Sequence, residues 1–151
     1  MNRRERRQAE KETLAISKQK TNDHVILKQV LNEIELLKIT LEGSNLEVFE
    51  KSDVIFFRGC AFTIAHIGEL LSRISCKTDT HELINVNLRA WKVLRNRIAH
   101  RLEKLDRQVV WDTFQIELPS LQYEIETFLK AESQITVEDE IAINGESNEM
   151  L

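Results

Sequence analysis

Large apolar residues recur every three or four positions along most of this chain, and this spacing limits the possible folds more than any other feature. In residues 23–43 the repeat consists of Leu27, Val30, Leu31, Ile34, Leu37 and Leu41. An α-helix places residues with this spacing on one side, whereas a half-buried strand alternates apolar and polar residues. The first repeat therefore predicts a long amphipathic helix that ends near Gly43.

Three further helices are predicted from the same spacing. The second begins near Ser52 or Asp53, the third runs to about Lys104, and the fourth begins near Asp106 and is kinked or divided at Pro119. The predicted buried side of the second helix contains Val54, Phe57, Ala61, Ile64, Ala65, Gly68, Leu71 and Ile74. Only four glycines and one proline occur in 151 residues, which leaves few turns for a β-rich fold. The expected class is all-α, an antiparallel four-helix up-down bundle.

Gly68 lies in the middle of the second predicted helix. A glycine in a helix interior costs about 1 kcal/mol relative to alanine, so its presence needs a structural reason. We expect a neighbouring helix to approach closely at this residue.

The two ends of the chain differ in charge from the predicted bundle, residues 23–130. Residues 1–20 carry seven Lys or Arg against three Glu, and residues 131–151 carry six acidic residues and no basic one. We expect residues 1–22 to be a basic extension, helical or flexible, whose cluster of Arg3, Arg4, Arg6 and Arg7 either contacts RNA or is a solvated end. Residues 131–151 are expected to be a disordered acidic tail, or a segment that docks on a partner. The net charge of −4 argues against a general polyanion binder, so any nucleic-acid contact must be local.

Composition also excludes several kinds of site. Cys60 and Cys76 have no partner histidine at metal-ligand spacing, so we expect reduced thiols, neither a metal site nor a disulfide, and no cofactor. The basic N-terminus lacks the apolar run of a signal peptide, and we expect no stretch to approach the length of a membrane span. These features predict a cytoplasmic protein.

The most unusual chemistry lies between Trp91 and His100. Helical geometry places the residues Leu88, Trp91, Leu94, Ile98 and Leu102 on one side of this segment. Arg89, Asn96 and His100 fall on the opposite side, and Arg95 lies between, with a side chain long enough to turn toward His100. Such an arrangement is either the solvated face of an ordinary amphipathic helix or a site that combines a cation, an amide and an imidazole.

A set of short motifs, in order, surrounds this segment between about Asp23 and Lys130. They are Leu-Glu-Gly at 41–43, Ile-Gly-Glu at 67–69, Arg-Asn-Arg-Ile-Ala-His at 95–100, and Val-Trp-Asp-Thr followed by Leu-Pro-Ser-Leu between 110 and 121. Together they resemble the HEPN-domain proteins, in particular the HepT-like ribonuclease toxins. The resemblance implies a homodimer in which two motif helices form a composite cleft for RNA.

The resemblance assigns roles to individual residues. It implies metal-independent cleavage of RNA, with Arg95, Asn96 and His100 as catalytic residues, Arg97 and Arg101 attracting the RNA backbone, and Glu69 supporting the site. The alternative is a non-catalytic helical module that binds RNA, nucleotide or a nucleotidyltransferase partner.

Leu102 departs from the family pattern. HepT-like toxins commonly have a tyrosine two residues after the motif histidine, and an MNT-type nucleotidyltransferase antitoxin modifies that tyrosine with AMP groups. The position carries no phenol in this chain. Neutralisation by direct binding, modification of another residue, and a role outside a toxin pair all remain open.

Overall fold

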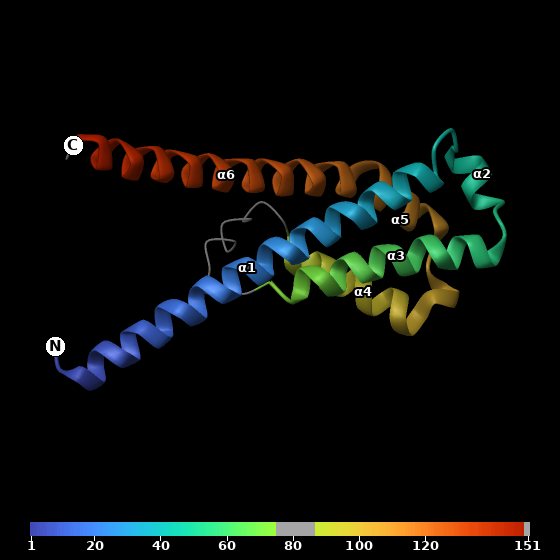
Figure 1. The fold of residues 1–151 in the computed structure, drawn as a ribbon. Coiled ribbons are helices and arrows are strands. Elements are labelled where there is room, and N and C mark those ends of the chain that lie inside the picture. The colour runs from blue at the N-terminus through green and yellow to red at the C-terminus, as the bar shows by residue number, and fades with distance from the viewer. Residues whose placement is uncertain (75–86, 150–151) are drawn as a thin grey trace.

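The structure, a computed structural model, describes residues 1–74 and 87–149, with the backbone alone at 135–140 and 142–149. Within these residues every regular element is a helix (Figure 1). The long elements are α1 (Arg3–Thr40), α3 (Val54–Ser72), α4 (Leu88–Arg101) and α6 (Leu118–Glu149). The short ones are α2 (Leu46–Glu50), η2 (Leu102–Lys104), α5 (Arg107–Asp112) and the π-helical η3 (Thr113–Glu117). Successive long helices run in opposite directions, which confirms the all-α, up-down architecture.

The apolar sides of these helices meet in one core. α1 contributes Leu27, Val30, Ile34 and Leu37, each at most 2% exposed. α3 contributes Phe57, Cys60, Ala61, Ile64, Ile67, Leu70 and Leu71. The predicted buried side of α3 is therefore largely correct, but Val54 is 47% exposed because it opens the helix at the rim of the bundle. Full burial of a large aliphatic side chain contributes about 1.5–3 kcal/mol, so this core accounts for most of the stabilisation.

Gly68 of α3 lies directly against α4. A methyl group at Gly68 would lie 3.1 Å from the carbonyl oxygen of Trp91 and 3.3 Å from Cβ of Arg95. Glycine is therefore used where the two helices pack most closely, which confirms the expectation from the sequence.

Arg107 joins the short α2 segment to α5. Its Nη1 donates hydrogen bonds to the carbonyl oxygens of Phe49, at 3.2 Å, and Ser52, at 2.6 Å. The guanidinium carbon also lies 4.7 Å from the ring centre of Phe57, within the range of a cation–π contact. One side chain thus satisfies carbonyl groups at the end of α2 and covers the aromatic edge of the core.

The fourth predicted helix is divided just before Pro119. It begins at Arg107, capped by Asp106, and its backbone becomes π-helical at Thr113–Glu117 before α6 starts at Leu118. A proline lacks an N–H group and its ring collides with the carbonyl four residues earlier, so the regular hydrogen-bond ladder is interrupted here.

α6 continues past Lys130 to Glu149, where the sequence indicated a disordered tail. No proline follows Pro119, so nothing in the backbone forces the helix to end. An ion pair between Lys20 and Glu132, at 2.8 Å, ties this part of α6 to α1.

By length and composition α3 could cross a membrane, so the expectation that no stretch approaches that length is wrong. However, 44% of its apolar window is buried inside the bundle, and its remaining surface carries Arg58, His66 and Glu69. These features are those of a core helix, which is hydrophobic because it packs on several neighbours.

The segment between α3 and α4, residues 75–86 with Cys76, lies outside the residues that the structure describes.

Candidate functional site

α4 presents the predicted polar face to the outside. Asn87 caps the helix by accepting a hydrogen bond from the Ala90 N–H at 3.0 Å. Trp91 and Ile98 turn toward the core and are 7% and 1% exposed. Asn96 and His100 lie on the other side of the helix and are exposed, as are Arg89, Arg97 and Arg101. Leu88, expected on the buried side, is 45% exposed and is the first residue of the helix.

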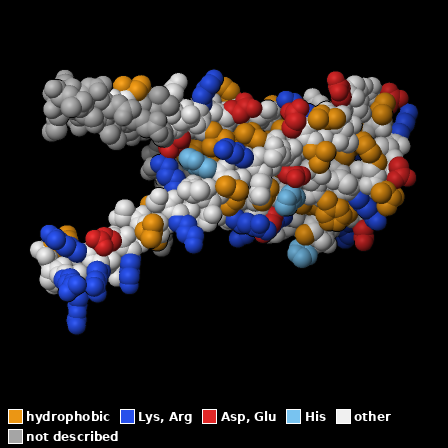
Figure 2. All heavy atoms as spheres, in the orientation of Figure 1, with side chains coloured by type: hydrophobic (Ala, Val, Ile, Leu, Met, Phe, Trp, Pro, Cys, Tyr) orange, Lys and Arg blue, Asp and Glu red, His pale blue; other side chains and the backbone are white. Residues whose placement is uncertain are grey.

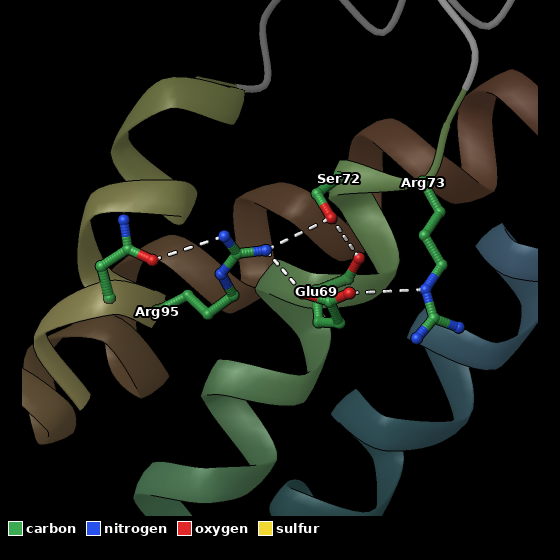
Figure 3. A network of polar contacts seen from close by, with 5 residues as sticks. Glu69, Ser72, Arg73 and Arg95 are labelled. Atoms are coloured by element: carbon green, nitrogen blue, oxygen red, sulfur yellow. Dashed lines mark hydrogen bonds and ion pairs between the residues drawn. The ribbon is translucent and has the colours of Figure 1, made fainter. Parts of the chain in front are cut away.

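The guanidinium of Arg95 is held by Glu69 of α3 (Figure 3). Nη1 of Arg95 donates a hydrogen bond to Oε2 of Glu69 at 2.5 Å, and Nη2 lies 3.3 Å from Oδ1 of Asn96. The close approach at Gly68 makes this contact possible, because it brings the backbones of α3 and α4 together one residue before Glu69. The structure thus joins Arg95, Asn96 and Glu69 in one network.

Two residues of this network were missed from the sequence. Arg73 places its Nε 3.6 Å from Oε1 of Glu69, and Ser72 lies 3.4 Å from Nη1 of Arg95. They follow Glu69 by four and three residues on α3, and helical residues at these spacings are neighbours. The signal was therefore present once Glu69 had been placed on a helix.

His100 stands apart from the network. Its side chain is exposed, and in the parts of the chain that the structure covers it forms no hydrogen bond and no ion pair. Arg95 was expected to turn toward His100, but it turns toward Glu69, which offers a carboxylate on the facing helix. The two residues are separated by about 140° around α4, so a single chain holds them on different sides of the same helix.

A hollow lies on the outward side of α4, beside the candidate residues. It is lined by Asn87, Arg89, Ala90, Val93, Leu94 and Arg97. Two guanidinium groups border this surface, so it suits an anionic ligand such as a phosphate. Arg97, expected to attract RNA, belongs to this hollow, whereas Arg101 lies exposed at the end of α4.

Other chemically reactive groups lie elsewhere. Cys60 is 3% exposed in the core, and this burial raises the pKa of its thiol, so it is not an activated nucleophile. Among the side chains that the structure describes, no group of three or more His, Cys, Asp or Glu could hold a metal ion. Leu102, where the family commonly has tyrosine, is partly buried and packs against the core.

Comparison with known families agrees with this geometry. The family model described as Ribonuclease HepT-like matches residues 30–128, which is more than half of the chain and includes both Glu69 and the motif helix. Comparisons with curated proteins and with solved structures found no match. The chain therefore belongs to the HepT-like ribonuclease family.

Proposed function

We propose that this protein is a metal-independent endoribonuclease whose active site forms between the α4 helices of two copies. The observation that supports it most is the outward face of α4. There Asn96 and His100 are exposed, and Asn96 lies beside Arg95, which Glu69 holds in position. One copy keeps Arg95 and His100 on different sides of α4. The second copy therefore supplies the catalytic group that one chain cannot bring to the same site.

Exposed apolar side chains of α3 and α4 support the dimer. Val93 is 51% exposed between the polar residues of α4, and Ile55 and Phe62 of α3 are 68% and 55% exposed. Ile55, Gly59 and Phe62 share one side of α3 by their helical spacing. Figure 2 shows hydrophobic side chains at the surface over α3. A second copy of the same surface would cover them around a twofold axis.

The proposed reaction uses the ribose 2′-hydroxyl. One His100 accepts its proton while the 2′-oxygen forms a bond to phosphorus and the bond from phosphorus to the 5′-oxygen breaks. The partner's His100 donates a proton to the departing 5′-oxygen, so the products are a 2′,3′-cyclic phosphate and a 5′-hydroxyl. Arg95 stabilises the charge on the phosphorane oxygens, and Asn96 orients the phosphate or the imidazole.

Incubation of the purified protein with RNA in the presence of EDTA tests this proposal. The parent should release fragments with cyclic phosphate ends, and His100→Ala and Arg95→Ala should each reduce cleavage by at least about a hundredfold. His66→Ala is the matched control, because it removes an exposed histidine of α3 from a different groove, beside α1. Cleavage that survives in both motif variants would leave the proposal without support.

A non-catalytic binding module is the second candidate, and one observation favours it. Glu69 already neutralises Arg95 in the single chain, which is sufficient for a structural or binding role. In that case His100→Ala would weaken the binding of RNA or nucleotide without changing a background rate of cleavage.

The proposal includes a place in a toxin–antitoxin pair in the cytoplasm, with an MNT-type nucleotidyltransferase as the partner. Leu102 cannot accept an AMP group, so such a partner would act by binding or through another residue. Co-expression of a small nucleotidyltransferase from the neighbouring gene should relieve growth arrest, and arrest that persists would exclude this partner.

A further inference from the structure

The N-terminal half of α1 extends beyond the bundle as an exposed helical arm. All side chains of residues 1–18 are exposed, and the first buried residue of the chain is Asp23. Asn2 begins the helix with a capping box, in which its side chain accepts the N–H groups of Arg4 and Glu5. Figure 1 shows this arm leaving the bundle on its own, away from α6.

Basic residues of the arm lie on one side of the helix. At about 100° per residue, the side chains of Arg3, Arg4, Arg7, Lys11 and Lys18 fall within an arc of about 100°, which we call the basic stripe. Figure 2 shows Lys and Arg side chains gathered on the arm. At about 1.5 Å per residue, the stripe is about 22 Å long. A nucleic-acid strand that rises about 3.4 Å per nucleotide carries several phosphates over that length.

Acidic residues of the arm leave the basic stripe uncompensated. Glu5 and Glu12 lie on the opposite side of the helix, and only Glu10 borders the stripe. Glu5 also accepts a hydrogen bond from the Asn2 N–H at 2.8 Å, and Glu12 accepts one from Gln8 at 2.9 Å. No basic-stripe side chain forms an ion pair with any residue that the structure describes.

The C-terminal helix α6, which includes most of the acidic tail, does not cover the basic stripe. Lys20 pairs with Glu132 of α6, and this contact shows which side of α1 faces that helix. The middle of the stripe lies about 150° around α1 from Lys20 and a similar angle from the buried residues Leu27 and Ile34. The stripe therefore faces away from both the core and α6, so neither of them covers it.

We propose that the basic stripe binds the phosphate backbone of an RNA and holds it for the site on α4. The occupant is a polyanion because the stripe consists of five cations that form no ion pair with the described residues. It is not a membrane because the only large apolar side chain within the stripe is Leu14. With no aromatic residue on the arm, binding depends on charge and not on base sequence. The assignment of the ligand as substrate rests on the proposed ribonuclease activity.

Binding of a short fluorescent single-stranded RNA, measured by anisotropy across a salt series, tests this inference. All proteins carry His100→Ala so that the probe stays intact. Substitution of Arg4, Arg7 and Lys11 by Gln should weaken binding at least about tenfold. The slope of log K against log salt should become shallower by about 2, since about 0.7 counterions are released for each phosphate contact in a single strand.

A charge-swapped variant is the matched control for net charge. Arg7→Gln with Gln8→Arg, and Lys11→Glu with Glu12→Lys, keep the composition while disrupting the basic stripe. This variant should also bind at least about threefold more weakly, because phosphate contacts are local. Equal affinity of all proteins at every salt concentration would overturn the inference. Stripe substitutions that weaken self-association and leave RNA binding unchanged would also overturn it. The occupant of the stripe would then be the acidic tail of a second copy.

The same measurements separate this inference from the proposed function. If the protein without His100→Ala cleaves RNA and stripe substitutions leave binding unchanged, the stripe inference fails and the nuclease stands. If no protein cleaves RNA but binding depends on the stripe, the nuclease proposal fails and the stripe inference stands.

Discussion

Gly68→Ala tests whether the contact between α3 and α4 controls the geometry of the candidate site. In an open helix this change should stabilise the protein by about 1 kcal/mol, because alanine has the higher helix propensity. At Gly68 the added methyl group lies 3.1 Å from the Trp91 carbonyl oxygen and 3.3 Å from Cβ of Arg95. Both are closer than ordinary van der Waals contact, and the first belongs to backbone, so α4 has to move.

Overpacking of this kind costs about 1–3 kcal/mol, which exceeds the gain in propensity. We therefore expect Gly68→Ala to lower the free energy of unfolding by up to about 2 kcal/mol. Gly59→Ala is the matched control, because it lies on the same helix with nothing within 4 Å of the added methyl group. It should stabilise the protein by about 0.5–1 kcal/mol.

Urea unfolding followed by circular dichroism measures both values, at several protein concentrations so that a dimer contact at Gly59 is detected. Equal stabilisation by both substitutions would refute the reasoning, because α4 would then have room for a side chain at Gly68.

Three further outcomes follow from the structure. Arg107→Ala should lower the free energy of unfolding by about 2 kcal/mol, because carbonyl groups at the end of α2 lose their hydrogen-bond donor. The control Lys104→Ala removes an exposed cation nearby and should change the free energy of unfolding by less than about 0.5 kcal/mol. In a Cys76→Ser background, Cys60 should react with a thiol reagent near pH 8 far more slowly in the folded than in the unfolded protein. Burial raises the pKa of the thiol and so lowers the thiolate fraction. Equal rates would contradict the placement of Cys60 in the core. If the proposed dimer forms through the outward face of α4, the parent should have the molar mass of a dimer by light scattering and Val93→Glu that of a monomer; a dimer mass for both proteins would contradict this placement of the contact.

The fold could be predicted because one sequence pattern, apolar residues at helical spacing, is repeated along the chain. Apolar residues at helical spacing define four helices, few residues interrupt them, and short connections make neighbours antiparallel. Gly68 was informative for the same reason, since an unfavourable residue inside a helix indicates a close contact.

Details that depend on tertiary position were harder to predict. The helical backbone of α6 beyond Lys130 was not expected, because composition shows how little a segment can bury but not whether the backbone remains helical. The exposure of Val54 and Leu88 follows from their places at helix starts, which periodicity alone does not reveal.

The candidate site was only partly predictable for a physical reason. The exposed face of α4 follows from helical angles. The partner of Arg95 does not, because Arg95 could turn either toward His100 on its own helix or toward Glu69 on α3. Only the approach of α3 at Gly68 decides that choice, and it brings Glu69 within hydrogen-bond distance.

Mixing parent and His100→Ala subunits tests the central claim most directly, namely that one RNA-cleaving site needs a histidine from each of two copies. The subunits are exchanged at a constant total concentration, and the initial rate of RNA cleavage is measured as the fraction of parent subunits varies. The account predicts that the rate falls with the square of that fraction, because only dimers with two histidines are active. A rate that falls in direct proportion to the parent fraction would show that each chain acts alone and would contradict the composite site.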